Sequence, residues 1–186
     1  MCIRDSYYGA EDAENIIILM GSATEAAREA IDYLMSQGKK VGMVAVHLYR
    51  PFSVKHLLAA VPKTVKRIAV LDRTKEPGAE GEPLYLDVKS AFYDVENKPL
   101  IVGGRYGLGS ADTTPAKIIA VYDNLELPEP KDHFTVGIVD DVTFTSLPEV
   151  EEIPLGDKST FEAKFYGLGA DGTVGANKNS VKIIGD

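Results

Sequence analysis

The sequence predicts an α/β protein of three layers, in which a mostly parallel five-stranded sheet carries helices on both faces. Short and wholly apolar segments such as 16–20 (IIILM) and 68–71 (IAVL) are typical of parallel strands that are buried on both faces. Segments with the apolar spacing of a helix alternate with these strands, which indicates repeated strand–loop–helix units. The pattern leaves the strand order open, and it also allows one antiparallel edge strand.

The first unit begins with a strand over 15–20. Gly21 allows a tight turn after it, and Ser22 with Glu25 has the spacing of a capping box at the start of a helix. Gly38 is typical of the position just beyond a helix C-terminus. Between them the apolar residues recur at helical spacing, and they are Ala23, Ala26, Ala27, Ala30, Ile31, Leu34 and Met35.

The second unit has a strand over 41–48, and Pro51 stops further ladder pairing after it. Ser53 is placed to cap a short helix that ends at Pro62. One face of this helix carries the apolar residues Val54, Leu57, Leu58 and Val61.

The third unit has the most elaborate loop of the chain. A strand over 68–71 leads into the loop 72–82, which holds six charged residues and a Pro-Gly turn. An amphipathic helix follows, with Leu84, Val88, Ala91, Phe92 and Val95 on one face.

The fourth unit begins with a strand over 100–102 and continues into the glycine-rich loop 103–109. Thr114 is expected to cap the next helix, with Pro115 at its first position. That helix buries Ile118, Ile119, Tyr122 and Leu125, and a fifth strand is expected over 134–139.

The domain organisation follows from changes of pattern along the chain. Residues 1–6 (MCIRDS) match nothing that follows, so we expect them to be a non-native leader. Residues 7–150 form the main domain, and residues 151–158 form a linker that is rich in acidic residues. Residues 159–186 have the pattern of a strand over 161–166, a glycine-rich loop and a helix. We therefore expect the truncated start of a second α/β unit, poorly packed by itself.

Composition excludes several classes of function. The chain has 186 residues and a net charge of −8, with no basic stripe, so nucleic acid and anionic membranes are not expected partners. Its longest apolar run is too short to span a bilayer, and no signal-peptide pattern precedes it, so we expect a cytoplasmic location. A single cysteine, Cys2, cannot hold an iron–sulfur cluster or a zinc site. His47, His56 and His133 lack the spacing of metal ligands.

Charged residues gather where the predicted strands end. The carboxyl ends of parallel strands meet at one edge of a sheet, where ligands and partners bind. Six charged residues should lie on that edge, and they are Arg50, Asp72, Arg73, Lys75, Glu76 and Arg105. An enzyme could use them, and so could a domain interface built on Arg–carboxylate pairs. The sequence offers no convincing nucleophile–base pair or metal-ligand cluster, because the combination Ser53, His56 and Asp72 is expected by chance. We therefore predict an interface, no catalytic residue and no metal site.

A second candidate site lies near the end of the chain. Gly167, Gly169 and Gly172 fit the pattern G-x-G-x-x-G, whose glycines let a backbone approach a phosphate at a helix N-terminus. Lys178 in the following helix could reach an anion. The pattern alone is a weak signal, and a glycine-rich turn that packs closely against a neighbour explains it equally well.

Taken together, several long strings resemble the pyruvate:ferredoxin (flavodoxin) oxidoreductase family. The resemblance covers residues 7–186, and the strings that carry it are MGS, VHLYRPFS, VLDRTKEPGAEGEPLYLDV, GGRYGLGSADTTPAKIIAVYDNL, FTVGIVDDVTFTSLP and FYGLGADGTVGANKNSVKIIGD. It implies an internal portion of a much longer enzyme. That portion is the second domain, similar to the transketolase C-terminal domain, together with the start of the third (gamma-type) domain.

The resemblance implies further expectations for the parent enzyme. It would decarboxylate pyruvate oxidatively with thiamine diphosphate, transfer the acetyl group to coenzyme A (CoA) and pass electrons through iron–sulfur clusters to ferredoxin or flavodoxin. It would act as a homodimer. The portion in hand would bind no cofactor by itself, would be inactive alone and would pack against the remaining domains. Its CoA-proximal residues would be Gly167, Gly169, Gly172, Asn177 and Lys178. Two alternatives stay open, a free-standing nucleotide-binding module and a regulatory interaction domain.

Overall fold

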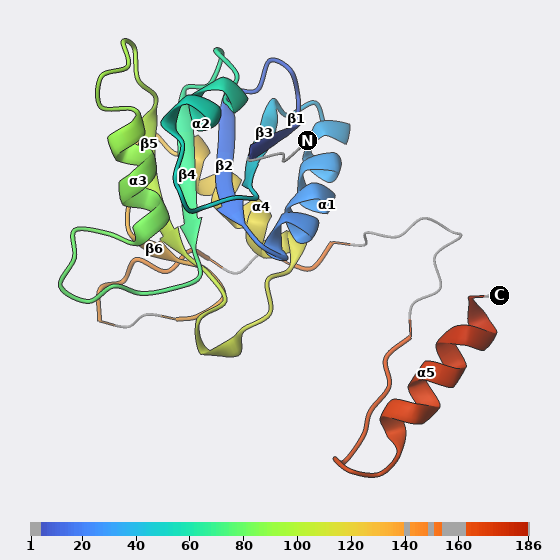
Figure 1. Cartoon of the computed structure of the whole chain (residues 1–186). Coiled ribbons are helices and arrows are strands. Elements are labelled where there is room, and N and C mark those ends of the chain that lie inside the picture. Colours follow the sequence, from blue (N-terminus) through green and yellow to red (C-terminus); the bar gives the residue numbers. More distant parts are fainter. Residues whose placement is uncertain (1–4, 140–141, 149–150, 154–162, 186) are drawn as a thin grey trace. The chain divides into compact units, whose positions relative to one another are not determined.

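The computed structural model describes residues 5–139, 142–148, 151–153 and 163–185. The chain divides into two compact units after residue 154 (Figure 1). The first unit contains the sheet, and the second contains a single helix among its described residues. Each unit is described by itself.

The first unit is built on a six-stranded sheet with the order β1-β3-β2-β4-β5-β6. All neighbouring strands are parallel except β1 and β3, which are antiparallel. The prediction of a mostly parallel α/β sheet is confirmed. The strands are β1 (Asp5–Gly9), β2 (Asn15–Met20), β3 (Val41–Val46), β4 (Arg67–Asp72), β5 (Leu100–Arg105) and β6 (Phe134–Thr135).

The predicted strand number of five is wrong because the sequence analysis missed the edge strand β1. Asp5 and Ser6, which had been assigned to a leader outside the fold, pair with Val46 and Ala45 of β3. The sequence DSYYG has no apolar run because β1 is half-buried along its whole length. Residues 1–4 of the expected leader lie outside the described residues.

Helices cover both faces of the sheet, as predicted. Helices α1 (Ala23–Ser36) and α4 (Pro115–Glu126) pack on one face, and α2 (Val54–Ala60) and α3 (Pro83–Ala91) pack on the other (Figure 1). Strand β2 shows why both faces must be covered. Ile17 and Leu19 point into the core under α1 and α4, while Ile16 and Ile18 point into the core on the opposite face.

Two of the predicted helix caps are confirmed. Gly38 has a φ of 82°, and the amides of Gly38 and Lys39 donate to the carbonyl oxygens of Met35 and Leu34, which is a Schellman motif. The Thr114 side chain accepts a hydrogen bond from the Lys117 amide, and Pro115 is the first residue of α4.

Two other predicted caps are wrong. Ser22 already has helical φ and ψ angles, so its hydroxyl makes no capping hydrogen bond with the first turn of α1. The Ser53 hydroxyl also makes no capping bond, because it lies 2.7 Å from Nδ1 of His56.

Strand lengths differ from the prediction where glycine or a turn intervenes. Strand β5 runs through Gly103 and Gly104 to Arg105, although these glycines were assigned to a loop. They are part of the strand because bulky rings lie against them: a Cβ atom on Gly104 would be 2.2 Å from the ring of Phe134. Strand β6 ends at Thr135 and not at Val139, and the chain then turns at Gly137, whose φ is 81°. Strand β3 ends two residues earlier than predicted.

The second unit has the predicted helix but not the predicted strand. Helix α5 spans Thr173–Ile184, directly after the glycine-rich loop. Residues 163–168 form no strand, so the strand expected over 161–166 is wrong in its described part, and residues 161–162 lie outside it. None of residues 163–185 is buried. Within the described residues of both units, no helix is long and apolar enough to cross a membrane.

Candidate functional site

The carboxyl ends of β4 and β5 carry the charged loop that the sequence singled out. Strand β4 ends at Asp72, loop residues 73–81 follow, and Glu82 directly precedes helix α3. The neighbouring strand β5 ends at Arg105, beside Asp72 in the sheet register. A short 3₁₀ helix, η1 (Leu108–Ser110), comes soon after β5. Both loops project from the same edge of the sheet (Figure 1).

Asp72 is buried, with 6% of its surface exposed, and it holds the start of α3. Its two carboxylate oxygens accept hydrogen bonds of 3.1 Å from the backbone amides of Leu84 and Tyr85. Burial raises the pKa of Asp72, and the two amide donors oppose that rise. The structure therefore gives Asp72 a partner inside the unit, which is the N-terminal turn of a helix.

Arg105 also has a partner inside the unit. Its Nε atom lies 2.5 Å from Oε1 of Glu82, whose side chain is only 1% exposed. The second oxygen of Glu82, Oε2, is buried and has no hydrogen-bond partner among the described residues. The sequence analysis missed Glu82, because nothing in the pattern distinguishes it from the exposed glutamates of the same loop. The pair ties the end of β5 to the start of α3.

Arg50 forms a third intramolecular group with Tyr49 and Asp87. Its guanidinium stacks on the Tyr49 ring at 3.8 Å, and Nη1 lies 2.7 Å from Oδ2 of Asp87. The Tyr49 hydroxyl donates to the same carboxylate at 2.8 Å. Burial, followed by this hydrogen bond, raises the pKa of Tyr49 to about 12. This group joins the segment after β3 to helix α3.

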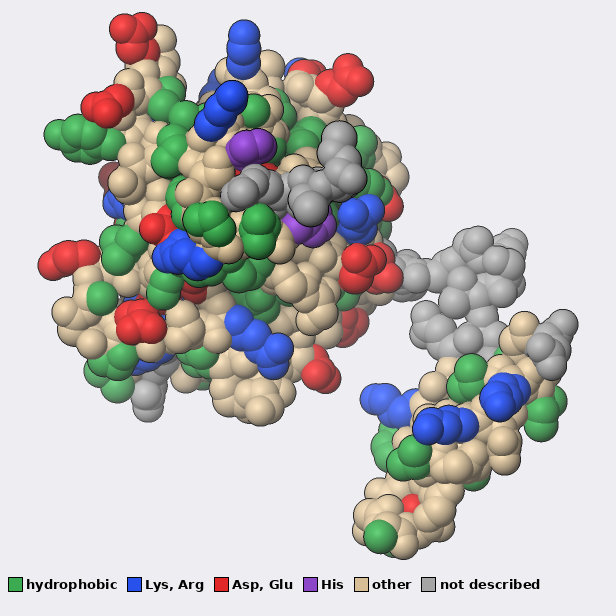
Figure 2. Space-filling model, in the orientation of Figure 1, with side chains coloured by type: hydrophobic (Ala, Val, Ile, Leu, Met, Phe, Trp, Pro, Cys, Tyr) green, Lys and Arg blue, Asp and Glu red, His purple; other side chains and the backbone are tan. Residues whose placement is uncertain are grey.

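The remaining three predicted residues, Arg73, Lys75 and Glu76, are exposed. None of them forms an ion pair with another described residue. Lys75 and Glu76 lie in the loop itself, and the side chain of Arg73 lies against Gly107 after β5. Over the face shown in Figure 2, Lys and Arg side chains are interspersed with Asp and Glu.

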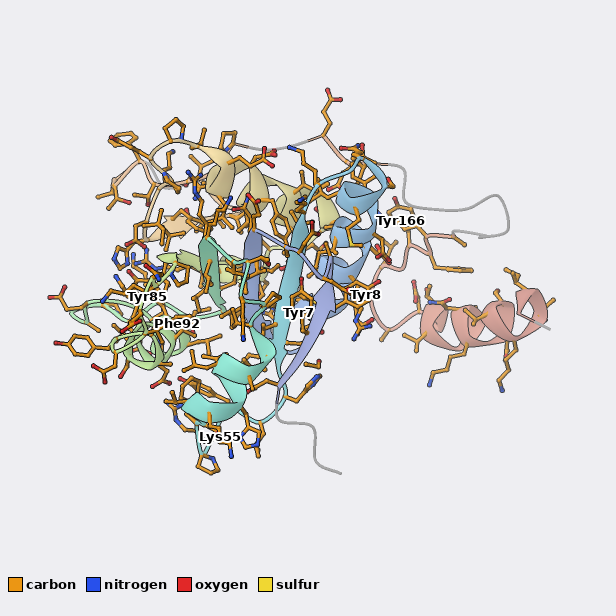
Figure 3. All side chains as sticks on the ribbon, turned by 90° about the horizontal axis from the view of Figure 1, so that it is seen from above. Tyr7, Tyr8, Lys55, Tyr85, Phe92 and Tyr166 are labelled. Atoms are coloured by element: carbon orange, nitrogen blue, oxygen red, sulfur yellow. The ribbon has the colours of Figure 1, made fainter. Side chains whose placement is uncertain are left out.

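A further polar network that the sequence analysis missed is centred on Tyr85 of α3 (Figure 3). Its hydroxyl donates to Oδ2 of Asp132 at 2.9 Å and accepts from Nζ of Lys89 at 2.7 Å. Oδ1 of Asp132 in turn accepts from the Gly103 amide at 2.6 Å. Burial is the main cause that raises the pKa of Tyr85. The network fastens α3, β5 and the segment before β6 together, so its role is structural.

The combination of Ser53, His56 and Asp72 does not form a catalytic triad. Ser53 and His56 are in contact, at 2.7 Å between Oγ and Nδ1. The hydrogen bonds of Asp72, however, go to the backbone amides of α3. Among the described residues, no group of three or more His, Cys, Asp or Glu side chains could hold a metal ion.

The glycine-rich loop of the second unit closes on its own aspartate. Oδ2 of Asp171 accepts from the Leu168 amide at 2.8 Å, and Oδ1 accepts from the Thr173 amide at 3.0 Å. Hydrogen bonds from Thr173 are the main cause that lowers the pKa of Asp171 to about 2. Gly172, with a φ of 82°, starts helix α5. A carboxylate therefore already occupies the position where a phosphate would meet the helix N-terminus.

The other predicted anion-site residues lie around this loop. Gly167 packs against the side chain of Thr173, and Gly169 has a φ of 117°. Asn177 and Lys178 are on α5 and line a shallow surface hollow of about 510 Å³ together with Gly175 and Lys182. The structure thus places Asn177 and Lys178 between one and two turns beyond Gly172, and Lys182 about one turn further along the same helix.

The comparison with protein families matches residues 13–118 to the model described as pyruvate:ferredoxin oxidoreductase core domain II. The chain is 59% identical over 182 residues to pyruvate-flavodoxin oxidoreductase of Enterobacter agglomerans. It is 57% identical over 180 residues to pyruvate:ferredoxin oxidoreductase of Moorella thermoacetica. These matches cover 97% of this chain but only 16% and 15% of the two relatives.

A similar solved structure is the 2-oxoglutarate:ferredoxin oxidoreductase of Magnetococcus marinus, with 2-oxoglutarate, CoA and succinyl-CoA bound. It has a TM-score of 0.48 and 22% sequence identity, and it covers 64% of this chain and 19% of that chain. The family match, by contrast, spans strands β2 to β5 and reaches into α4, and it includes the charged loop and the Arg105–Glu82 and Arg50–Asp87 ion pairs. This chain belongs to the pyruvate:ferredoxin oxidoreductase core domain II family.

Proposed function

We propose that this chain works as an internal part of a pyruvate:ferredoxin (flavodoxin) oxidoreductase, which converts pyruvate, CoA and oxidised ferredoxin into acetyl-CoA, CO₂ and reduced ferredoxin. The observation that carries the proposal is the combination of 59% identity with coverage of 97% of this chain and 16% of the relative. Sequence similarity at this level along nearly the whole chain supports the same place in a longer polypeptide.

The chain's own share in that enzyme is packing between domains. Its first unit is held together by ion pairs and helix caps at the carboxyl edge, and it contains no nucleophile–base–acid set among the described residues. Four charged loop residues remain exposed there, which supports a contact surface, and they are Arg73, Lys75, Glu76 and Glu80. We propose that the partners of this surface are the remaining domains, in a cytoplasmic homodimer that passes electrons to ferredoxin or flavodoxin.

The cofactors of the reaction belong to other parts of the enzyme. An iron–sulfur cluster needs several cysteine ligands, and this sequence has only Cys2. Thiamine diphosphate would supply the carbanion chemistry of decarboxylation when it is bound. The residues described above offer no group of carboxylates for a diphosphate-bound metal ion, so no step of the reaction is assigned to them.

A chimera, in which this chain replaces the matching segment of a known relative, tests the proposal. We would replace the matched segment of the Enterobacter agglomerans enzyme with residues 5–185 and measure pyruvate- and CoA-dependent reduction of methyl viologen. The chimera is expected to be active, and the isolated chain is expected to show no turnover. Turnover by the isolated chain, or an inactive chimera that is folded and carries its cofactors, would contradict the proposal. Tight binding of adenine nucleotides by the isolated chain in calorimetry would instead support a free-standing nucleotide-binding module.

We also propose that the glycine-rich loop and α5 lie beside CoA in the complete enzyme. Because Asp171 occupies the helix N-terminus, the contact to a CoA phosphate falls to Lys178, with Asn177 beside it. In the chimera, Lys178→Ala is expected to raise the KM for CoA and to leave the KM for pyruvate unchanged. Lys164→Ala, which removes an exposed lysine before the loop, serves as the control. Equal KM values for CoA in both variants would refute this placement.

A further inference from the structure

The charges at the carboxyl edge are not equivalent, and their differences point to one contact residue. Asp72, Arg105 and Arg50 each have a partner inside the first unit, at distances of 2.5–3.1 Å. A side chain that already has a well-placed partner gains less from a second one and must be desolvated to meet it. The docking surface is therefore expected to depend on the loop charges that have no ion-pair partner in the described residues, which are Arg73, Lys75, Glu76 and Glu80.

Of these four side chains, Arg73 is placed by its contact with the loop after β5, where its stem lies against Gly107. A Cβ atom on Gly107 would be 2.9 Å from Nε of Arg73, 3.2 Å from Cγ and 3.3 Å from Cδ. The arginine stem thus fills the space that a side chain at position 107 would occupy. Gly107 has a φ of 63°, a conformation that also favours glycine there. Two independent features therefore keep this place open for Arg73.

Arg73 has no ion-pair partner among the residues that the structure describes. Tyr106 lies next to Gly107, and its buried hydroxyl donates to the carbonyl oxygen of Met20 at 3.2 Å. The positive charge of Arg73 acts to lower the pKa of Tyr106, against the effect of burial, so the guanidinium lies near that ring. Two acids at this edge have other partners, since Asp72 accepts from the amides of α3 and Glu82 pairs with Arg105. An exposed guanidinium without an ion-pair partner among the described residues can bind a carboxylate through two parallel hydrogen bonds.

We propose that Arg73, held against Gly107, is the docking point for an aspartate or glutamate side chain from another domain of the oxidoreductase. This inference rests on the proposed function, because the relatives have more than four-fifths of their length outside the matched segment. A carboxylate of another domain is the acceptor that this edge can meet, because most of each relative lies outside the matched segment and the planar guanidinium pairs with a carboxylate through two parallel hydrogen bonds. Fixing the stem in advance lowers the entropy that such a contact loses.

Zero-length cross-linking tests the partner directly. A carbodiimide joins an amine to a carboxylate only when the two are in contact, and an arginine does not react. We would introduce Arg73→Lys into the active chimera, treat it with carbodiimide and map the products by mass spectrometry. The expected result is a new cross-link from position 73 to an Asp or Glu outside the segment 5–185. The parent chimera lacks this cross-link. Its absence from the variant, or links only to acids within 5–185, would overturn the proposal.

Charge reversal gives an independent measurement. Arg73→Glu should weaken the association of the isolated chain with the rest of the polypeptide, supplied as a separate chain, by about fivefold or more at low salt. The loss of affinity should shrink as ionic strength rises.

Lys55→Glu, on the exposed side of α2 (Figure 3), is the matched control and should leave the affinity unchanged. Equal affinities for both variants would refute the role of Arg73, whereas no association of the unchanged chain would refute the packing role itself. Competition by free phosphate at millimolar concentration would identify an anion site instead.

Discussion

At the scale of single residues, Asp72 shows how a charge that looked available for a partner is used inside the fold. Its carboxylate satisfies two amides at the start of α3 that have no acceptor within the helix. Moving an ionised carboxylate from water into the protein interior is unfavourable, and the raised pKa of Asp72 reflects that cost. The residue therefore contributes order to the loop at the expense of burying a charge.

We expect Asp72→Ala to lower the free energy of unfolding by about 1–2 kcal/mol, because two buried amides lose their acceptor. Asp72→Asn should cost less, since its amide oxygen can still accept one of the two bonds. Urea unfolding at pH 7 measures both. Glu80→Gln, which removes an exposed carboxylate of the same loop, is the control and should leave the unfolding midpoint unchanged.

The pH dependence follows from the direction of the shift. A carboxyl whose pKa is higher in the folded state binds more protons there than in the unfolded state. The contribution of Asp72 to stability is therefore largest below its ordinary pKa of 3.8 and falls as the pH rises through the raised value. In Asp72→Asn that fall should disappear from the urea unfolding curves. An unchanged pH profile in the variant would show that Asp72 is not the group responsible.

Arg105 and Glu82 make a second prediction at this scale. Removal of Arg105 leaves a buried carboxylate without compensation, since its other oxygen already lacks a partner. We expect Arg105→Ala to cost about 3 kcal/mol or more. The double variant Glu82→Leu with Arg105→Met should be more stable than Arg105→Ala, because no buried charge remains. Chemical denaturation gives the free energy of unfolding of both variants. A lower value for the double variant than for Arg105→Ala would contradict this account.

At the scale of secondary-structure elements, the junction of β5, β6 and α3 depends on glycines that bring rings close to the backbone. Gly103 lies against the ring of Tyr85, and Gly104 lies against the fully buried ring of Phe134. Strand β6 has only two residues, so its place in the sheet depends on Phe134 more than on ladder hydrogen bonds. The glycines here are packing residues of a strand.

We expect Gly104→Ala to destabilise the first unit by about 1–3 kcal/mol, because a Cβ atom would stand 2.2 Å from the Phe134 ring. Hydrogen exchange should show the loss first at the Val136 amide, which donates to the carbonyl oxygen of Arg105, and at the Thr135 amide, which donates to that of Thr145. Gly175→Ala on α5, where a Cβ atom meets nothing within 4 Å, is the control and should raise helix content instead. A Gly104→Ala variant of unchanged stability would mean that Phe134 has room to move.

At the scale of the whole molecule, the two units differ in what stabilises them. The first has buried cores on both faces of its sheet. The second has no buried residue in 163–185, and apolar side chains such as Leu168, Val181 and Ile183 are exposed. Tyr166 is also exposed (Figure 3). An apolar helix that buries nothing gains little stability from the hydrophobic effect.

A chain that ends at residue 153 should therefore unfold thermally at the same midpoint as the full chain, because none of residues 163–185 is buried. Circular dichroism melting measures this. A chain that ends at residue 127 loses Phe134, Val136 and Leu147 from the core and should unfold at a lower temperature. A clear loss of stability in the longer of the two truncated chains would show that residues beyond 153 contribute to the first unit.

Local pattern was sufficient for most of the fold. Buried strands such as β2 and amphipathic helices such as α1 and α4 are specified by apolar spacing within one segment, and the Thr114 and Gly38 caps are specified by a few neighbouring residues. The spacing of residues did not predict the structure where contacts between distant segments determine which residues form a strand. Strand β1 forms because β3 offers an open edge, and Gly103 and Gly104 are in a strand because rings from α3 and β6 lie on them.

The same division holds for the candidate site. The sequence alone determined the strand–loop–helix order, and therefore that the charges of loop 72–82 gather at one edge of a parallel sheet. Only the tertiary structure decided which of those charges remain available. Asp72 and Arg50 have partners in α3, and Arg105 has its partner in Glu82 just before that helix. These partners are 12 to 37 positions away along the chain, which is beyond the reach of any local pattern. Arg73 lies against Gly107 and forms no ion pair with another described residue. Pairing depends on which distant side chains the fold brings within a few ångströms, and the spacing of residues along the chain does not contain that information.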